Sequence, residues 1–90
     1  MKLEIYSIKD IKVAFRQPIY FHNFEEAKRA CQFAVNSVDD KNELYLAPQD
    51  FELWYLGEYD DSNGIIVPGV EFKLNLAELK RGDANAKQDL

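Results

Sequence analysis

The sequence has a single cysteine, Cys31, and a single histidine, His22, and this scarcity limits the chemistry open to the chain. One cysteine forms no internal disulfide, which is typical of a reducing compartment, and it excludes a zinc site built from several cysteines. A Ser-His-Asp or Cys-His pair would need His22, which directly precedes a predicted helix cap. Cys31 falls on the apolar side of that helix, so we predict a buried small side chain. We therefore expect no enzyme, no metal site and no cofactor.

Long hydrophobic runs are also missing. No stretch approaches the ~20 apolar residues that span a bilayer, and the N-terminal residues lack the apolar segment of a signal peptide. We expect an intracellular protein with no membrane partner. The net charge of −5 is uneven, because residues 43–90 carry −6 and residues 1–42 carry +1. This balance argues against broad binding to duplex DNA, which requires many neutralised phosphates, but it leaves room for a local basic patch in the first half.

The apolar pattern predicts strands and one clear helix. The helix begins after Asn23, where Glu26 three residues later completes a capping-box pattern, and it ends near Asn36 or Ser37. The predicted strands are 3–8, 12–15 with a continuation at 19–21, 51–59, 65–67 and 70–74. The order β-β-α-β-β predicts an α+β fold, a small and mostly antiparallel sheet with one helix packed on one face. We place the domain at residues 1–79 and a mobile tail at residues 80–90.

Several local features refine this outline. Residues 38–50 are predicted to form a polar loop, anchored by Tyr45 and Leu46. Gly57 inside a strand indicates a bulge or a close backbone approach. Pro68 and the following glycine are expected to end the strand that begins at Ile65.

Twelve aromatic residues exceed what one small core easily hides. Tyr6, Tyr20, Trp54 and Tyr55 lie on or beside predicted strands, and some of them should lie on the sheet face that the helix does not cover, where they could stack unpaired bases or form a homodimer contact. Tyr6 and Trp54 are the candidates for stacking or for an interface, although a core position accounts for most aromatic residues in a domain of this size.

The basic residues nearest to such a face are Lys9, Lys12 and Arg16 on the first predicted hairpin, and Lys28 and Arg29 on the helix. Lys12 and Arg16 share a strand parity and would form one stripe, and Lys28 and Arg29 lie on the polar side of the helix. These four are the candidates for binding the phosphates of a nucleic acid. An ordinary solvated charged surface is the alternative.

Three stretches of the chain resemble one family. They are the opening strand Met-Lys-Leu-Glu-Ile-Tyr-Ser at residues 1–7, the helix with Ala-Lys-Arg at 27–29 and Ala-Val-Asn at 34–36, and Pro-Gln-Asp-Phe-Glu-Leu-Trp-Tyr-Leu-Gly-Glu-Tyr-Asp-Asp at 48–61 closed by Gly64. This pattern is similar to the small nonstructural protein of gokushovirus-type Microviridae, which are single-stranded DNA phages. The resemblance covers residues 1–67. It implies a phage accessory protein in the bacterial host cytoplasm that acts in single-stranded DNA synthesis or packaging, and it transfers no site residues.

Two hypotheses of function follow, and a dimer that assembles a DNA groove would combine them. In the first, the protein binds single-stranded DNA weakly, with the basic residues on phosphates and a strand aromatic on a base. In the second, it is a homodimeric adaptor that contacts phage or host replication and packaging proteins without touching DNA. The Trp54 face and the edge strand near Ile65 would then be the interface.

Overall fold

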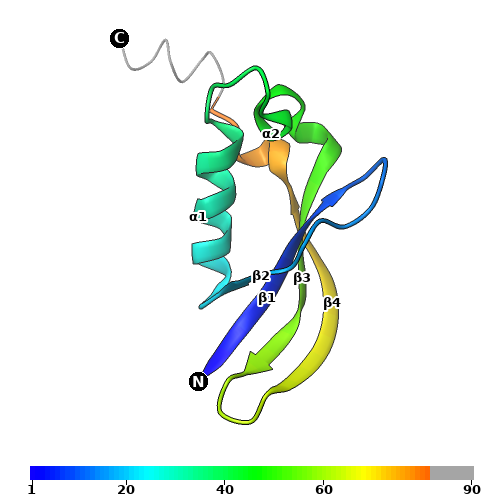
Figure 1. Ribbon diagram of the computed structural model, residues 1–90. Coiled ribbons are helices and arrows are strands. Elements are labelled where there is room, and N and C mark those ends of the chain that lie inside the picture. Colours follow the sequence, from blue (N-terminus) through cyan, green and yellow to red (C-terminus); the bar gives the residue numbers. More distant parts are fainter. Residues whose placement is uncertain (82–90) are drawn as a thin grey trace.

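The chain folds as a four-stranded antiparallel sheet with one long helix across one of its faces (Figure 1). The computed structural model describes residues 1–81. The strands lie in the order β2-β1-β3-β4, so β2 and β4 are the edges, and this arrangement confirms the predicted α+β fold. The elements are β1 (Lys2–Asp10), β2 (Ile19–Phe21), α1 (Phe24–Val35), α2 (Glu43–Leu46), β3 (Phe51–Asp60) and β4 (Ile65–Asn75), with 3₁₀ turns at Pro48–Asp50 and Leu76–Leu79.

Helix α1 begins where the sequence predicts, because Asn23 caps it. The Asn23 side-chain oxygen accepts a hydrogen bond from the Glu26 backbone N–H at 2.8 Å, and the Glu26 carboxylate accepts one from the His22 N–H at 2.9 Å. Both bonds satisfy backbone donors that have no partner inside the helix. The helix then lies close against the sheet because its inner side carries small residues. Its buried residues are Ala27, Cys31 and Val35, which confirms the predicted burial of the cysteine.

The core lies between α1 and one face of the sheet, and Tyr6 is at its centre. The Tyr6 side chain is only 2% exposed, and its ring centroid lies 6.1 Å from that of Phe21 and 5.5 Å from that of Tyr55. Its hydroxyl donates to the Glu4 carboxylate at 2.6 Å, and burial raises the pKa of Tyr6. The prediction that Tyr6 stacks a base or forms an interface is therefore wrong, because β1 turns this position toward the helix.

The segment between β1 and β2 is a loop, so the predicted strand at residues 12–15 is wrong. The Val13 N–H donates to the Asp10 carbonyl and the Asp10 N–H donates to the Ala14 carbonyl, which closes a tight turn. Phe15 then forms an isolated bridge with Lys9. Strand β2 begins beyond Pro18 and pairs with β1 over three residues.

Strand β4 runs without a break through Pro68 and Gly69, where we predicted its end. A proline is tolerated here because β4 is an edge strand, in which a missing N–H removes no bond from the centre of the sheet. The predicted bulge at Gly57 is confirmed, since the register shifts next to it on both sides of β3. Gly57 has a φ of +153°, and an added Cβ would collide with the Val67 carbonyl oxygen.

The predicted loop at residues 38–50 contains α2 and a 3₁₀ turn. The Asn42 side chain caps α2 by accepting from the Leu44 N–H at 3.1 Å. Leu44 is the buried anchor of this segment, whereas Tyr45 is half-buried and Leu46 is 57% exposed, so the prediction of Tyr45 and Leu46 as the anchor is wrong for Leu46. In α2 the helical spacing points Leu44 toward the core and leaves its neighbours more exposed to solvent. A four-residue helix is too short to show a helical repeat of apolar residues in the sequence.

Lys80, near the end of the described residues, holds the chain against the C-terminal end of α1 by hydrogen bonds. Its Nζ donates to the Val35 carbonyl at 3.1 Å and to the Tyr45 carbonyl at 2.8 Å. These bonds satisfy a carbonyl at the helix C-terminus, where a cation is also favoured by the helix dipole. Residues 82–90 of the predicted tail lie outside the described residues, so the tail and the boundary at residue 79 stay predictions.

Candidate nucleic-acid interface

The sheet face that α1 leaves uncovered carries a set of aromatic rings. Successive strand residues point to opposite faces, and Leu53 belongs to the core, so Trp54 lies on the other face. Phe72 pairs with Trp54 across β3 and β4 and shares its face. Tyr20 pairs with Ile5, whose neighbour Tyr6 faces the helix. We call this surface the aromatic face, and its rings are Phe15, Tyr20, Trp54, Tyr59 and Phe72.

Trp54 is the centre of a row of three rings. Its indole lies edge-on to Phe15, with centroids 5.6 Å apart and planes at 80°, and edge-on to Phe72, at 5.7 Å and 77°. A second contact joins Tyr20 to Tyr59 at 5.6 Å. Edge-to-face contacts of this kind are favourable and hold the rings in fixed orientations.

The outer rings of the aromatic face are accessible to solvent. Phe15 is 43% exposed, Phe72 46% and Tyr20 49%. Large aromatic side chains with this exposure, gathered on one face, are typical of a surface that meets a partner. The rings combine accessibility with fixed orientation, which suits stacking against planar groups.

Lys9 supplies a cation to this face. Its Nζ lies 5.1 Å from the Trp54 ring and 5.3 Å from the Phe15 ring, within the range of a cation–π contact. Glu52 lies opposite Lys9 in the β1–β3 register, and its carboxylate accepts a hydrogen bond from the Trp54 Nε1–H at 3.0 Å. The face therefore has one positive and one negative side chain beside its central ring, so its attraction for phosphates is local and weak.

Lys12 and Arg16 do not form the predicted stripe, because they lie in a loop and each faces a carboxylate. The Lys12 Nζ is 3.4 Å from an Asp50 oxygen, and the Arg16 guanidinium donates to Glu43 at 2.9 Å. The Arg16 guanidinium also lies 4.8 Å from the Phe51 ring, on the helix side of the sheet. Exposed ion pairs of this kind add little stability, but each carboxylate offsets the attraction of its cation for phosphate.

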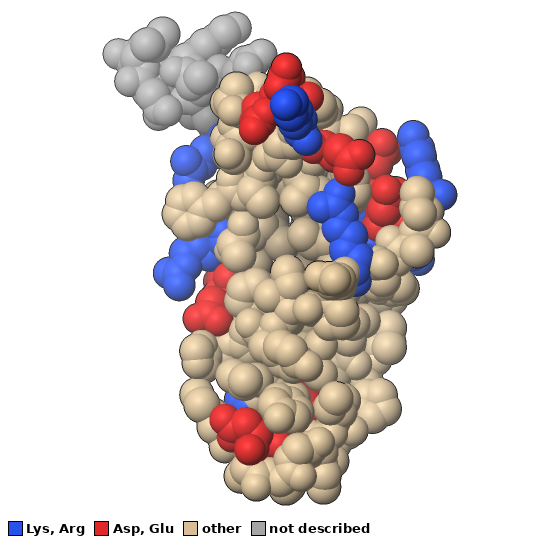
Figure 2. Space-filling view, in the orientation of Figure 1, with Lys and Arg blue, Asp and Glu red and all other residues tan. Residues whose placement is uncertain are grey.

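Lys28 and Arg29 lie on α1, on the opposite side of the sheet from Trp54. No ion pair involves either residue within positions 1–81. Figure 2 shows separate basic groups over α1 at the left and over the β1–β2 loop at the right. The structure thus does not gather the four predicted basic residues around Trp54, and a role for the two helix residues stays a prediction.

Sequence reasoning missed most of the aromatic face. Of its five rings only Trp54 was chosen as a candidate site residue. Tyr20 was named among the strand aromatics and Lys9 among the basic residues nearest to them, but neither was chosen for the site. The signal for Trp54 was the alternation along β3, which places Trp54 on the opposite face from Phe51, Leu53 and Tyr55. Phe72 shares that face only because of the register shift between Leu53 and Trp54, and Phe15 reaches it from a loop, so neither was readable from spacing.

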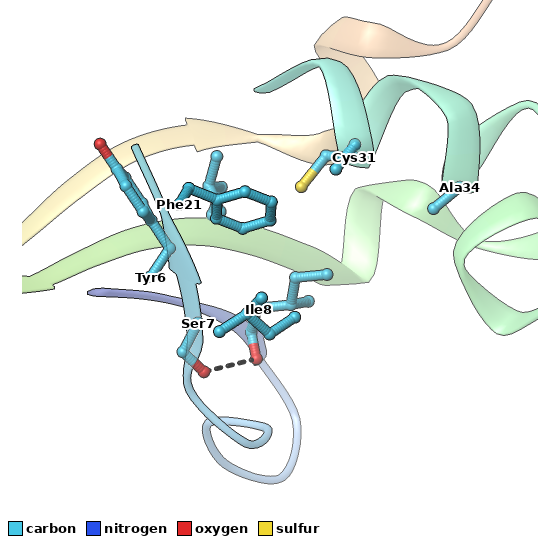
Figure 3. A pocket seen from close by; sticks show the side chains of 9 residues that line it. Tyr6, Ser7, Ile8, Phe21, Cys31 and Ala34 are labelled. Atoms are coloured by element: carbon cyan, nitrogen blue, oxygen red, sulfur yellow. Dashed lines mark hydrogen bonds between the residues drawn. The ribbon is translucent and has the colours of Figure 1, made fainter. Parts of the chain in front are cut away.

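An apolar groove of about 140 Å³ opens between α1 and the β1–β2 edge (Figure 3). Its walls include Ile8, Phe21 and Cys31, whose sulfur points toward the Phe21 ring. The Ser7 hydroxyl at its base is already committed, because it donates to the Arg16 carbonyl at 2.6 Å. Burial raises the pKa of the Cys31 thiol to about 11, so the thiol is neutral near pH 7 and a poor nucleophile. The groove offers apolar contact and no reactive group.

Among residues 1–81 no cluster of three histidine, cysteine, aspartate or glutamate side chains is placed to hold a metal ion. Within the same residues no helix has the length and apolar character to cross a membrane.

Comparison with known proteins identifies the family of the chain. A family model described as Phage ORF5 protein matches residues 3–79. The matched segment runs from the second residue of β1 to the end of the last 3₁₀ turn, so it contains all of the sheet except Lys2, the whole of α1 and all rings of the aromatic face. No curated protein and no solved structure matches the chain.

Proposed function

We propose that this phage accessory protein, which belongs to the Phage ORF5 protein family, binds single-stranded DNA through its aromatic face. The observation that carries the proposal is the row Phe15–Trp54–Phe72, fixed by ring contacts and open to solvent at both ends. Unpaired bases have exposed planar faces that stack on such rings, with about 1–3 kcal/mol per base.

The charges favour a single strand over a duplex. A duplex buries its base faces and is held mainly by many phosphate contacts, which a chain of net charge −5 supplies poorly. On the aromatic face Lys9 is the cation next to Trp54, and Glu52 lies directly opposite it. Stacking therefore provides most of the affinity, and one or a few phosphate contacts provide the remainder.

The biological setting of the proposal is a phage with a single-stranded genome. We place the protein in the gokushovirus-type Microviridae, on the three stretches that resemble that group. In the cytoplasm of the bacterial host it would cover newly made single strands and so favour their packaging over their copying into duplex. Weak binding suits this step, because the protein has to leave the strand as the capsid takes it up.

A homodimeric adaptor is the second candidate, and a separate observation favours it. The apolar residues of β4 from Ile65 to Val70 are exposed, and they extend the apolar surface beyond the aromatic face. In this case phage or host replication proteins, and not bases, would cover the rings. The two candidates differ in whether DNA alone changes the environment of Trp54.

The chain has one tryptophan, so its fluorescence reports on the proposed site directly. The experiment titrates purified full-length protein into a labelled oligo-dT strand, at low and at physiological salt, while anisotropy and Trp54 emission are followed together. We expect saturable binding, quenching of Trp54 with the same midpoint, and a shallow log–log salt slope equivalent to a few phosphates. A duplex of the same length is the matched control and should bind more weakly.

Two results would overturn the proposal. Absence of binding at low salt, by protein with the circular dichroism of a folded α+β domain, would favour the adaptor. Binding without any change in Trp54 emission would show that DNA contacts another surface, for which Lys28 and Arg29 on α1 are the candidates.

A further inference from the structure

We propose that two copies of this chain pair antiparallel along the edge strand β4. This inference does not depend on nucleic-acid binding. It starts from the composition of the strand, because residues 65–70 read Ile-Ile-Val-Pro-Gly-Val and contain no charge. In the structure Ile65 and Ile66 are each 55% exposed, Val67 57% and Val70 63%.

The exposure of β4 affects both of its faces. Ile66 pairs with Tyr59 and lies on the aromatic face, whereas Val67 pairs with Glu58 and points to the other side, beyond the reach of α1. A strand in contact with water on one face normally alternates apolar and polar residues, and a continuous apolar run is typical of a strand that is covered on both. In Figure 2 the lower part of the molecule, where the β3–β4 hairpin projects, is mostly uncharged, apart from one group of acidic side chains at the lower left.

Within residues 1–81, strand β4 has β3 on one side and no strand on the other, so it also presents unpaired backbone groups. An edge with apolar side chains is a template for another strand unless charges or prolines block it. Pro68 removes one donor, and the first charged residues, Glu71 and Lys73, pair with each other at 2.9 Å beyond the uncharged run. The edge is thus only partly protected against pairing with another strand, because residues 65–70 carry no charge.

A second copy is the occupant that fits, because the strand is complementary to itself. In an antiparallel pair centred on Gly69, Pro68 lies opposite Val70 of the partner subunit. Ile66 then lies opposite Phe72 of the partner subunit, so every pair on the aromatic face is apolar. On the other face Val67 lies opposite Glu71 of the partner subunit. No charge meets a like charge directly across the pair, which would be destabilising.

The two-fold symmetry of such a pair would bring the aromatic faces of both copies to the same side of the sheet. A two-fold axis that relates neighbouring antiparallel strands is perpendicular to the sheet, so the pair doubles the four-stranded sheet to eight strands with both aromatic faces on one side. A single strand of DNA could then cross both rows of rings, and the second contact would be intramolecular.

The first test measures the mass of the protein in solution without DNA, by size-exclusion chromatography with light scattering. We expect twice the chain mass of 10.5 kDa. Val70→Lys places two like charges at diagonal positions of the pair and should give a monomer at the same concentration. Val38→Lys is the matched control, because Val38 is 79% exposed and lies outside the sheet, and it should stay dimeric.

The second test traps the geometry. Gly69→Cys, in a Cys31→Ala background, places one thiol per copy beside the two-fold axis, within the Cα separation that a disulfide spans. An added Cβ at Gly69 meets only the Tyr55 ring at 3.6 Å, so the variant should fold. Mild oxidation should then give a covalent dimer. Tyr20→Cys, on the opposite edge of the sheet, is the control and should not cross-link.

Each outcome decides the matter. A wild-type monomer at high micromolar concentration overturns the pairing. A dimer that Val70→Lys leaves intact, or that Gly69→Cys fails to trap, places the contact elsewhere. If Val70→Lys disturbs folding by circular dichroism, Ile66→Lys replaces it, because Ile66 is also exposed. DNA binding by a proven monomer would leave the proposed function standing without the dimer.

Discussion

The indole of Trp54 lies edge-on to the ring of Phe72, with centroids 5.7 Å apart, and the two residues are direct partners in the β3–β4 register. The pair joins a central strand to an edge strand on the uncovered face of the sheet. Because the register fixes both backbones, removal of one ring leaves the other on the same face of the sheet, although without the contact that holds its orientation. The contribution of each ring to binding can therefore be measured separately.

Trp54→Ala is expected to weaken binding to oligo-dT by about 5- to 150-fold, which corresponds to the loss of one stacked base. Fluorescence anisotropy at fixed low salt measures the change. Phe33→Ala is the control, since Phe33 is 70% exposed but lies on α1, and it should bind as the wild type does. Equal losses in the two variants would contradict the assignment of the site to the sheet.

Lys9→Gln is expected to lower the steepness of the salt dependence by ~0.7, the value for one phosphate contact on a single strand. The physical reason is that Lys9 is the cation beside Trp54 and Phe15. Lys28→Gln removes the same charge from α1 and should leave the slope unchanged. The reverse pattern would show that the helix, as first predicted from the sequence, carries the phosphate contacts.

Local signals in the sequence predicted the elements whose causes are local. Asn23 and Glu26 form the cap of α1 within four residues, and Gly57 produces a bulge through its own backbone freedom. The segment at residues 12–15 was mispredicted because Val13 and Phe15 alternate as in a strand, whereas a turn that starts at Asp10 takes the chain out of the ladder.

The face of each ring depends on register, which the sequence does not contain. Strand β1 carries a polar residue on each parity, Glu4 and Ser7, so the pattern does not reveal which face meets the helix. Tyr6 was therefore placed outside, and Lys9, although named among the nearby basic residues, was not chosen as a site residue. The long-range ion pair of Arg16 with Glu43 likewise joins residues that are 27 positions apart, and spacing arguments do not reach that far.

Gly57→Ala is expected to destabilise the fold by ~2–4 kcal/mol, because the backbone there has φ of +153° and the new methyl group would collide with the Val67 carbonyl. Gly64→Ala separates the two causes. Gly64 also has positive φ, at +75°, but no atom lies within 4 Å of an added Cβ, so the loss should be about 1 kcal/mol. Urea unfolding of both variants measures the difference, and equal losses would show that the bulge relaxes around the methyl group.

Cys31 makes the stability of the domain sensitive to alkaline pH. Burial raises the pKa of its thiol to about 11 in the folded chain, above the value near 8.5 of an exposed thiol. Between these values the unfolded chain loses the proton and the folded chain keeps it, so the free energy of unfolding falls as pH rises, by about 2–3 kcal/mol across the window. Below pH 8 both states are protonated and the effect vanishes.

Cys31→Ala should remove the part of this slope between pH 9 and pH 10, as measured by urea unfolding at half-unit steps. Tyr6, whose pKa burial also raises, keeps its own loss of stability above pH 10 in both proteins and so serves as an internal control. The variant loses core contacts at every pH, which shifts the whole curve without changing its slope. Iodoacetamide at pH 8 gives an independent measure, because it should alkylate Cys31 far more slowly in the native chain than in urea. A native thiol that reacts as fast as the unfolded one would mean that the groove beside α1 opens readily, and the alkaline slope should then be absent as well.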